Sequence, residues 1–535
     1  MNIKNKKIAT ILGLSIVFVF GVLAILPFLG VGFLPTHDGE FHFIRFMEFF
    51  RMLSQGYVIP RWAPTINSGY GLPVFEFLYP FANYISALLH VIGMEFVTSF
   101  KISSALGYIT ASLFSFLWLK KRFGVFPAVI GTIVSAYVPY WFVELYVRGA
   151  IGEVWAIAFL FMALWSIEAK KPLLFATAMT GIVLSHNILT IIVGPFILVY
   201  LLWRRDWKWV LYMLLGIGLA SWFWLPAIFE SKYMVGLNTV SFKDHFASIV
   251  ELFIPSWGTN FSGVGYSANK MSFQIGIGPI MWMMLACILL VIRRIKGRER
   301  TELLGLFGIV VLALCMTLPQ SIRIWEIVPV IQYIQHPWRY LVYLIPVTAY
   351  IGAVVGLTIK KKWFVVLLTL VSMGLSFGYT RGAVYEPRND AYYASRTNFT
   401  DSTSSMGNSL STIWTPWKET KSLTTATDVV GNPIIVDGPN EKYLDRQYTV
   451  SLDSDTVIRF HILYFPGWTA YVDGELTSID YQSQGTIDVG VPKGTHTVRL
   501  VMQETVIRML ADVISVGSLV IFGYLGILWY RRRHQ

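Results

Sequence analysis

A short polar segment directly after the first hydrophobic run holds the residues best suited to chemistry. Thr36–His42 reads Thr-His-Asp-Gly-Glu-Phe-His, and five of its seven residues carry a titratable or hydroxyl side chain. Ionisable groups so close to a membrane are costly, which makes them candidates for a functional site. Asp38 and Glu40 are the two carboxylates of this segment that could accept a proton as a general base.

The chain after this segment is predicted to form an amphipathic helix over Glu40–Leu53, lying in the plane of the membrane interface. Four polar residues recur there at three-residue spacing and are surrounded by apolar ones, namely His42, Arg45, Glu48 and Arg51 among Phe41, Ile44, Phe46, Phe49 and Phe50. Asp38 would then lie at or near the helix N-terminus, where Asp commonly caps a helix and is favoured by the helix dipole. Asp38 could serve as the N-cap of this helix or as a general base, and the two roles can coexist.

A stretch rich in glycine and proline follows and is predicted to form a fixed, irregular loop. Irregular backbone near a membrane is tolerated where it lines a cavity. For each lone polar residue the alternative is a side chain that reaches the interface or forms a local salt bridge. The polar residues expected to form the site are His37, His42, Arg45, Arg61, Asn67, Tyr79, Glu144, Arg148, Glu153, His186, Asn187, His336 and Arg339.

The composition is far from that of a soluble globular protein. Of the 535 residues 55% are hydrophobic, and the mean hydropathy is +0.57. The aromatic share of 16% suits belts at two membrane interfaces. Cys287 and Cys315 both lie in apolar runs, so neither a disulfide framework nor a cysteine metal site is predicted.

The formal net charge of +12 does not indicate a nucleic-acid partner. The basic residues gather in short clusters that each adjoin a hydrophobic run, as topological anchors on the cytoplasmic side would. The rest of the chain is mildly acidic, so no basic face is left for a polyanion. The lipid bilayer is therefore the partner that the charge pattern predicts.

A crossing needs about 20 apolar residues, and ten runs come near that length. They are Ile8–Leu29, Ile102–Leu119, Val125–Phe142, Ile151–Ile167, Trp209–Ile228, Ile275–Ile292, Leu303–Leu318, Trp338–Leu357, Trp363–Phe377 and Ile507–Trp529. The first run is too long for a cleaved signal peptide, and no small-residue cleavage site follows it.

Two further segments are assigned by requiring that every basic cluster lie inside. Leu173–Trp203 lies between two basic clusters, so it is predicted to cross twice with Ser185–Asn187 as its outer turn. Phe75–Ile92 is predicted to be a helix that lies on the outer surface or dips into it, because one crossing before Lys120 is enough. The total is twelve crossings with both termini in the cytoplasm.

This topology leaves four large segments on the outer face, so any chemistry is expected outside the cell. They are Gly30–Phe100, Phe229–Gln274, Pro319–Pro337 and Tyr379–Val506. We find neither a Walker-type phosphate loop nor a dinucleotide fingerprint, so a nucleotide-driven cytoplasmic reaction is not expected.

The last outer segment is rich in Ser, Thr, Asp and Gly, and it is predicted to form a small antiparallel β-sandwich over Val430–Glu504. Asp473-Gly474 is a hairpin turn signal. The predicted strands are Arg446–Leu452, Val457–Tyr464, Thr469–Val472, Thr486–Val491 and Thr495–Met502. The domain could be a spacer or lid, or it could hold a polymer acceptor. The predicted divisions are a membrane domain at 1–380 with its site at 31–100, the β-rich domain at 381–506, and a final helix with a basic tail at 507–535.

The chain resembles multi-spanning bacterial membrane proteins related to the lipoteichoic-acid glycosylation family, often labelled "6-pyruvoyl-tetrahydropterin synthase-related". The similarity runs from Ile8 to Trp529. It is carried by His37-Asp38-Gly39 with His42 and Arg45, Arg61-Trp62, Asn67–Gly71 with Pro73, Tyr79-Pro80, Arg148–Ala150 with Glu153, His186-Asn187, Pro337–Arg339, Phe465–Trp468 and Asp473-Gly474. The label would imply a soluble zinc enzyme, and no clustered histidines with ligand spacing support that.

The N-terminal half is similar to the wider GT-C superfamily of glycosyltransferases. That resemblance implies a sugar donor linked to polyprenyl phosphate on the outer leaflet, and an acidic residue of the first outer loop as base. Asp38 matches that position, with Glu40 as the alternative. It also implies an extracellular glycopolymer as acceptor, such as teichoic acid or a wall polysaccharide.

The chemistry implied in this way needs few groups. The acceptor hydroxyl needs a base as it attacks the anomeric carbon. The departing lipid phosphate is a good leaving group, so it needs positive charge rather than an acid. Arg148, Arg339 and Arg61 are candidates, since arginine binds phosphate in a forked geometry. No convincing carboxylate cluster is present, so neither a metal nor another cofactor is predicted.

Two other classes remain as alternatives. A lipid-linked sugar flippase or polysaccharide transporter would predict internal repeats and charged residues in the middle of spans. We find no convincing repeat, and the polar residues gather at the outer face. A non-catalytic scaffold of surface-polymer assembly would tolerate the loss of Asp38, which the enzyme would not.

Overall fold

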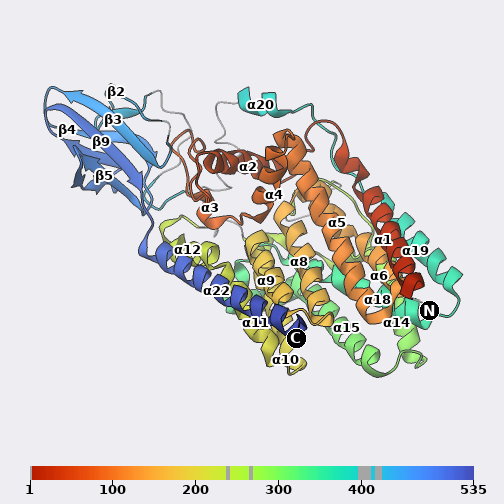
Figure 1. Cartoon of the computed structure of the whole chain (residues 1–535). Helices are drawn as coiled ribbons and strands as arrows, with labels where there is room; N and C mark the ends of the chain where they lie inside the picture. Colours follow the sequence, from red (N-terminus) through yellow and green to blue (C-terminus); the bar gives the residue numbers. More distant parts are fainter. Residues whose placement is uncertain are drawn as a thin grey trace.

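The chain folds into a helical bundle with a β-rich lobe at one end (Figure 1). This is a computed structural model, and it describes residues 3–236, 241–263, 269–395, 411–415, 424–440 and 442–534. The predicted fold class is confirmed: a polytopic α-helical protein carries a C-terminal β-sandwich. Parts of the predicted domain at 381–506 (396–410, 416–423 and 441) lie outside the described residues.

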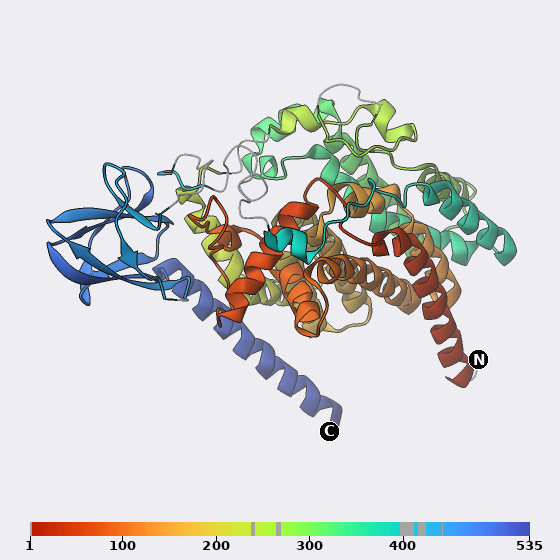
Figure 2. The same cartoon turned by 90° about the horizontal axis from the view of Figure 1, so that it is seen from above.

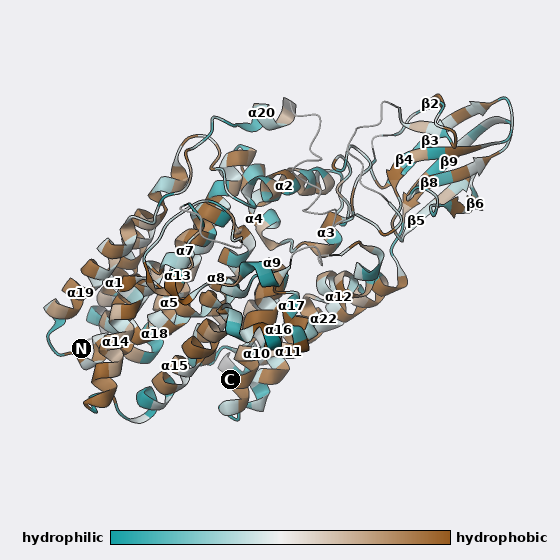
Figure 3. Cartoon of the chain, turned by 180° about the vertical axis from the view of Figure 1, so that it is seen from behind, coloured by the Kyte–Doolittle hydropathy of each residue, from teal (hydrophilic) through white to brown (hydrophobic). Residues whose placement is uncertain are grey.

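Two closely packed pairs of apolar helices form the centre of the bundle, and other helices surround them. α5 packs against α8, and α18 packs against α6. Apolar residues run along these helices (Figure 3), as a membrane domain requires. The helices are α1 (Ile3–Ile25), α5 (Phe96–Phe123), α6 (Val125–Ala136), α8 (Ile151–Glu168), α9 (Pro172–Ser185), α10 (Asn187–Trp203), α11 (Trp207–Leu219), α12 (Ser221–Glu230), α14 (Ile277–Val291), α15 (Gly297–Thr317), α18 (Leu344–Thr358), α19 (Lys362–Phe377) and α22 (Val506–His534).

The number of crossings is smaller than the predicted twelve. Within the described part of the chain, six helices are long and apolar enough to cross a membrane, or eight if each of two bent pairs counts as one span. Four predicted crossings correspond to α9, α10, α14 and α19, which have only 14, 17, 15 and 16 residues. At about 1.5 Å per residue such helices reach roughly 21–26 Å, less than a hydrocarbon core of about 30 Å.

The amphipathic helix predicted over Glu40–Leu53 is present as α2 (Gly39–Ser54). The segment predicted as an outer helix before α5 is divided into α3 (Val74–Phe77) and α4 (Phe81–Val91). Figure 1 shows α2, α3 and α4 together across one end of the bundle. The predicted turn between the two halves of Leu173–Trp203 is also present, since His186 separates α9 from α10.

One bent pair of helices positions much of the site. α6 ends at Ala136, and after a bend of 52° the chain continues as α7 (Pro139–Phe142) and the π-helical turn η2 (Val143–Arg148). Isolated π-helical turns are frequent at functional sites. The wider turn presents Glu144 and Arg148 on one side of the chain, directly before α8 begins.

The β-rich lobe is a sandwich of two antiparallel sheets. Their strand orders are β1-β4-β8-β7 and β2-β3-β9-β5-β6. Asp473 and Gly474 have φ angles of 50° and 89° and join β5 to β6, so the predicted hairpin turn is confirmed. The strands are β1 (Ala426–Asp428), β2 (Val436–Asp437), β3 (Asp445–Leu452), β4 (Thr456–Leu463), β5 (Trp468–Val472), β6 (Glu475–Thr477), β7 (Ile479–Asp480), β8 (Thr486–Val491) and β9 (Gly494–Met502).

The lobe packs on the irregular loop before α3. The Leu463 amide donates a hydrogen bond to the Tyr70 carbonyl at 2.9 Å. The rings of Trp62 and Trp468 meet edge to face with centroids 5.7 Å apart. Figure 2, which views the molecule from above, shows the lobe at one side of the bundle. α22 runs from the lobe to the C-terminus.

Candidate active site

Asp38 stands at the N-terminus of α2, but its carboxylate does not cap the helix. Asp38 is the N-cap residue by position, and Thr36 Oγ1 accepts the hydrogen bond from the Gly39 amide at 3.0 Å. The predicted N-cap position is therefore present, but the Asp38 side chain makes no capping hydrogen bond. The carboxylate is left available for other contacts.

The backbone of this segment is tied to the end of η2. The His37 amide donates to the Val147 carbonyl at 2.9 Å, and the Asp38 amide donates to the Arg148 carbonyl at 2.8 Å. The Asp38 carboxylate also meets the Arg148 guanidinium, with Nη2 and Oδ2 3.5 Å apart. Val147 and Arg148, more than 100 residues further along the chain, thus hold Asp38 in place.

This close approach requires glycine at two positions. A Cβ atom on Gly149 would come within 2.2 Å of Thr36 Oγ1, and one on Gly39 would meet the same oxygen at 2.2 Å. Gly149 also has a φ of +67°, in the left-handed region that side chains disfavour. The turn from η2 into α8 can therefore reach the Asp38 segment only with glycine there.

Arg148 is the centre of a buried charged cluster. Its Nη1 donates to Glu144 at 2.5 Å and to Glu153 at 2.7 Å. The guanidinium carbon lies 4.7 Å above the ring of Trp338, within cation–π range. A buried arginine surrounded in this way is fixed in position.

The three carboxylates on Arg148 differ sharply in accessibility. The side chains of Glu144 and Glu153 are fully buried, whereas that of Asp38 is 40% exposed. A substrate approaching from solvent can therefore reach Asp38 and neither of the other two.

Glu153 joins a second arginine to the cluster. Arg339 Nε donates to Glu153 at 3.1 Å, and His186 Nε2 lies 3.6 Å from the same oxygen. Tyr140 donates its hydroxyl to the other oxygen of Glu153 at 3.4 Å. The structure thus brings together Asp38, Arg148, Glu153, His186 and Arg339, which are far apart in the sequence.

α2 carries a second row of site residues along one face. Asp38, His42 and Arg45 follow at steps of four and three residues, which places them one above another. The Tyr79 hydroxyl lies 3.5 Å from His42 Nε2. Burial lowers the pKa of His42 to about 4, with the Arg45 charge adding to the effect, so His42 is neutral near pH 7. Burial raises the pKa of Tyr79, so its hydroxyl keeps its proton.

Arg45 is the arginine of the site that lacks a carboxylate partner. The residue is 9% exposed, and no Asp or Glu within the described ranges forms an ion pair with it. Its Nε atom has no hydrogen-bond partner there either. An unpaired buried charge is costly, so this guanidinium is suited to an anion that the substrate would bring.

A row of histidines borders the site beyond Asp38. His37 Nε2 lies 2.7 Å from the Thr259 carbonyl, and its ring stacks on Phe261 at 4.1 Å. His336 stacks on Trp338 at 5.1 Å, and His245 meets His336 at 4.5 Å. Burial lowers the pKa of both His37 and His336.

Three features of this region were not predicted from the sequence. They are the roles of Tyr140 and His245 and the cation–π contact of Trp338 with Arg148. No local pattern marks them, because each acquires its role from a contact made across the fold. Pro337-Trp338-Arg339 was part of the resemblance, and it was the nearest signal.

Several predicted site residues lie elsewhere. Glu40 pairs with Arg388 at 2.9 Å and so faces away from Arg148. Asn187 donates to the Phe77 carbonyl at 2.9 Å and holds α3 against α10. Asn67 is buried in the loop under the β-lobe, with a φ of 54°.

Arg61 belongs to a separate charged cluster beside α22. It pairs with Glu76 at 3.2 Å and with Glu504 at 3.3 Å. Arg508 lies between Glu76 and Glu230, at 3.5 and 2.8 Å. These contacts fasten the outer loop, α12 and α22 together, so Arg61 is already engaged by carboxylates at a distance from Asp38.

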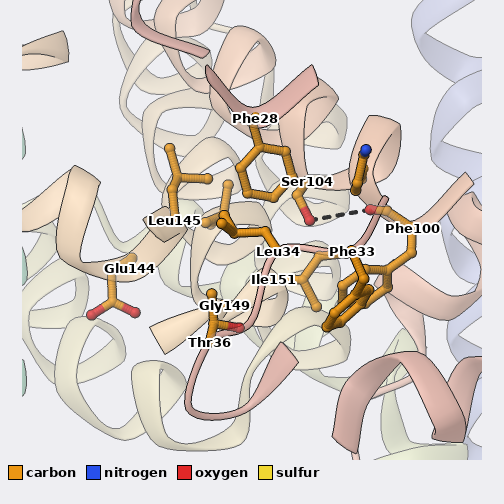
Figure 4. A pocket seen from close by; sticks show the side chains of 12 residues that line it. Phe28, Phe33, Leu34, Thr36, Phe100, Ser104, Glu144, Leu145, Gly149 and Ile151 are labelled. Carbon is orange, nitrogen blue, oxygen red and sulfur yellow. Dashed lines mark hydrogen bonds between the residues drawn. The ribbon is translucent and has the colours of Figure 1, made fainter. Parts of the chain in front are cut away.

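A small, mostly apolar pocket lies behind the turn at Gly149 (Figure 4). Phe28, Leu34 and Phe100 line it, and Thr36 and Glu144 border it. Lys101 and Glu144 are the charged residues of its lining, and the 40% exposed side chain of Asp38 marks the accessible side of the site. In the part of the chain that is described, no group of three or more His, Cys, Asp or Glu side chains could hold a metal ion.

Comparison with known proteins gives distant likenesses. No family model matches the chain. An uncharacterised protein of Lactococcus lactis subsp. cremoris (strain MG1363) is 26% identical over an alignment of 257 residues that covers 43% of this chain and 41% of that protein. The chain thus spans less than half the length of this relative.

Three solved structures show a distant likeness to the chain. The arabinofuranosyltransferase AftD from Mycobacteria aligns with a TM-score of 0.44 at 13% identity, over 71% of this chain and 27% of that one. The Archaeoglobus fulgidus oligosaccharyltransferase gives 0.41 at 14%, over 70% and 56%. ArnT from Cupriavidus metallidurans, bound to undecaprenyl phosphate, gives 0.34 at 15%, over 64% and 59%.

Proposed function

We propose that the protein is a membrane glycosyltransferase of the GT-C kind. It would move a sugar from a polyprenyl-phosphate carrier to an extracellular glycopolymer, teichoic acid or a polysaccharide. The observation that carries the proposal is the difference among the carboxylates on Arg148: Asp38 alone of the three is open to solvent. A fixed, accessible carboxylate beside buried positive charge is what glycosyl transfer from a lipid phosphate needs.

In this mechanism Asp38 is the general base. Its carboxylate takes the proton of an acceptor hydroxyl as that oxygen forms a bond to the anomeric carbon. The bond from the anomeric carbon to the phosphate oxygen breaks, and the electron pair leaves with the lipid phosphate. Arg148 positions Asp38 through the ion pair and the backbone hydrogen bond.

Arg45 is proposed to bind the phosphate of the donor. It lies on the same face of α2 as Asp38, is buried, and has no carboxylate partner among the described residues. Arg148 and Arg339 are already paired with Glu144 and Glu153, so they are proposed to position the groups of the site rather than to bind the phosphate. His42 and Tyr79 would complete the wall of this subsite.

The remaining assignments follow the same proposal. Both termini would lie in the cytoplasm, with the site on the extracellular side, because the basic clusters adjoin the opposite helix ends. The chain would then belong with the lipoteichoic-acid glycosylation proteins that it resembles. The predicted divisions at 1–380, 381–506 and 507–535 are part of this proposal.

The test is sugar transfer in membranes. Wild type and Asp38→Asn, adjusted to equal folded amounts, would be compared with polyprenyl-phosphate sugar donors and a wall-polymer acceptor. Transfer by wild type that is lost in Asp38→Asn supports the base. Equal transfer by both contradicts it, and sugar translocation without transfer would indicate a flippase.

A further inference from the structure

Four aromatic rings form a cluster where the β-lobe meets the helical bundle. Tyr464 and Tyr481 stack face to face, with centroids 3.8 Å apart and planes at 5°. Trp414 meets Tyr481 at 4.8 Å and stacks on Tyr233 at 5.7 Å. We call Tyr233, Trp414, Tyr464 and Tyr481 the aromatic platform.

Backbone contacts from three segments hold the platform in place. The Ile413 amide donates to the Tyr233 carbonyl at 3.0 Å, which ties the Trp414 turn to the short 3-10 helix Ser231–Tyr233 that follows α12. Thr415 Oγ1 donates to the Gly485 carbonyl at 3.1 Å, and the Tyr464 amide donates to the same oxygen at 2.8 Å. The rings are therefore positioned before any ligand binds, which lowers the entropic cost of binding.

The polar atoms of the platform are available. All four residues are partly exposed. Their hydroxyl groups and the Trp414 indole nitrogen form no hydrogen bond to the described residues. A core cluster would bury these groups with partners, so the platform combines apolar ring surface with donors and acceptors that have no partner within the described ranges.

We propose that the aromatic platform binds sugar units of the glycopolymer acceptor, an assignment that rests on the proposed function. Sugar rings present apolar C–H faces and a rim of hydroxyl groups. The platform offers the matching combination of aromatic faces and uncommitted polar atoms. Binding at a distance from the reacting hydroxyl would hold a long acceptor near the site and raise its local concentration.

The platform is connected to the candidate active site through α3. Phe465 packs against Tyr233 at 6.3 Å and against Phe77 at 6.1 Å. Phe77 is two residues before Tyr79, whose hydroxyl faces His42. A glycan held on the platform and running over α3 would reach Asp38 from its accessible side.

An aromatic belt at the membrane interface is the competing explanation. Gln482 and Ser483, next to Tyr481, are exposed and polar. Lys232 lies 5.0 Å from the Tyr233 ring centroid. The stacked pair Tyr464 and Tyr481 also belongs to the β-lobe rather than to a helix of the bundle. These surroundings favour a hydrated glycan over lipid.

The experiment measures glycan binding by the full-length protein in detergent. Dextran, mannan, arabinoxylan and deacylated lipoteichoic acid would be immobilised, and binding followed by biolayer interferometry. Wild type is expected to bind at least one of them. Trp414→Ala should weaken that binding by about tenfold or more, as truncation of a buried aromatic anchor does. Tyr481→Phe, which keeps the stack and loses one hydroxyl, should weaken it less.

The control is Trp363→Ala, which changes an exposed tryptophan of α19 that is not part of the aromatic platform. It should bind as wild type does, and thermal unfolding would verify that all variants are folded. Absence of glycan binding by wild type, or equal binding by Trp414→Ala, overturns the proposal. So does Trp414→Ala losing association with anionic vesicles while keeping glycan binding, which identifies a lipid belt. Asp38→Asn should bind glycan normally, so failure of the transfer test and failure of this proposal are distinguishable.

Discussion

Asp38 and Arg148 are joined twice, once through backbone and once through side chains. The Asp38 amide donates to the Arg148 carbonyl at 2.8 Å, and the carboxylate lies 3.5 Å from the guanidinium. The double contact fixes both the start of α2 and the direction of the carboxylate. Function at this site should therefore be sensitive to small displacements of the carboxylate.

The first prediction separates Asp38 from Glu40 by changing position rather than charge. Asp38→Glu keeps the acid but moves it by about one bond length, and a misplacement of about 1 Å can cost on the order of 100-fold in rate. Glu40→Gln should keep transfer within a fewfold of wild type, since Glu40 pairs with Arg388. Initial rates of sugar transfer in membranes provide the measurement. The reverse pattern would move the base to Glu40.

The second prediction is that replacing Arg45 weakens donor binding without lowering the stability of the protein. Arg45→Met removes a buried charge without a carboxylate partner among the described residues, so the free energy of unfolding should stay the same or rise. The KM for the polyprenyl-phosphate donor should rise about tenfold or more, because a charge-assisted phosphate contact is lost. Arg51→Met is the matched control, since Arg51 on the same helix is half exposed and paired with Glu48. An unchanged donor KM in Arg45→Met would remove Arg45 from the phosphate subsite.

Elements with a local signal could be predicted from the sequence. α2 was expected at Glu40–Leu53 and spans Gly39–Ser54, because its spacing of polar and apolar residues is helical. The hairpin at Asp473 was expected from a two-residue turn signal. The turn at His186 was found by requiring that the basic clusters share one side.

Properties that depend on contacts between distant segments could not be predicted. Hydropathy shows that α9, α10, α14 and α19 are apolar, but not how long each helix is, so the number of crossings was too high. Arg61 and Arg148 look equivalent in the sequence, yet Arg61 pairs with Glu76 beside α22, and Arg148 pairs with Glu144 and Glu153. Their environments follow from tertiary packing, which one sequence without its fold does not reveal.

Glu153 leads to a third prediction, about stability. It is fully buried and contacts both Arg148 and Arg339. Glu153→Gln leaves two buried guanidinium groups without that charge, and breaking a buried pair costs roughly 3–5 kcal/mol. The matched control is Glu326→Gln on the surface, which loses a pair with exposed Lys243 and should change stability far less. Denaturant unfolding in detergent compares them. Equal stabilities for the two variants would contradict the central role of Glu153.

A fourth prediction concerns the glycine at the end of η2. Gly149→Ala places a Cβ within 2.2 Å of Thr36 Oγ1 at a φ of +67°. Left-handed strain alone costs of order 1–3 kcal/mol, and relieving the clash would push the Asp38 segment away from Arg148. Transfer should fall even where folded protein is recovered. Gly56→Ala also has a positive φ but meets nothing within 4 Å, so it should lose stability without losing specific activity.

The last prediction concerns pH. Burial lowers the pKa of His42 from about 6.5 to about 4, so the folded state binds this proton less readily than the unfolded state does. The stability associated with neutral His42 is therefore complete above about pH 6.5 and is lost as the pH falls toward 4. Wild type should lose unfolding free energy in that window, and His42→Gln should lose less. Burial also lowers the pKa of His37. The quantity to measure is therefore the difference in unfolding free energy between wild type and His42→Gln at each pH. A difference that stays constant from pH 7 to pH 4 would show that His42 titrates normally in the folded protein.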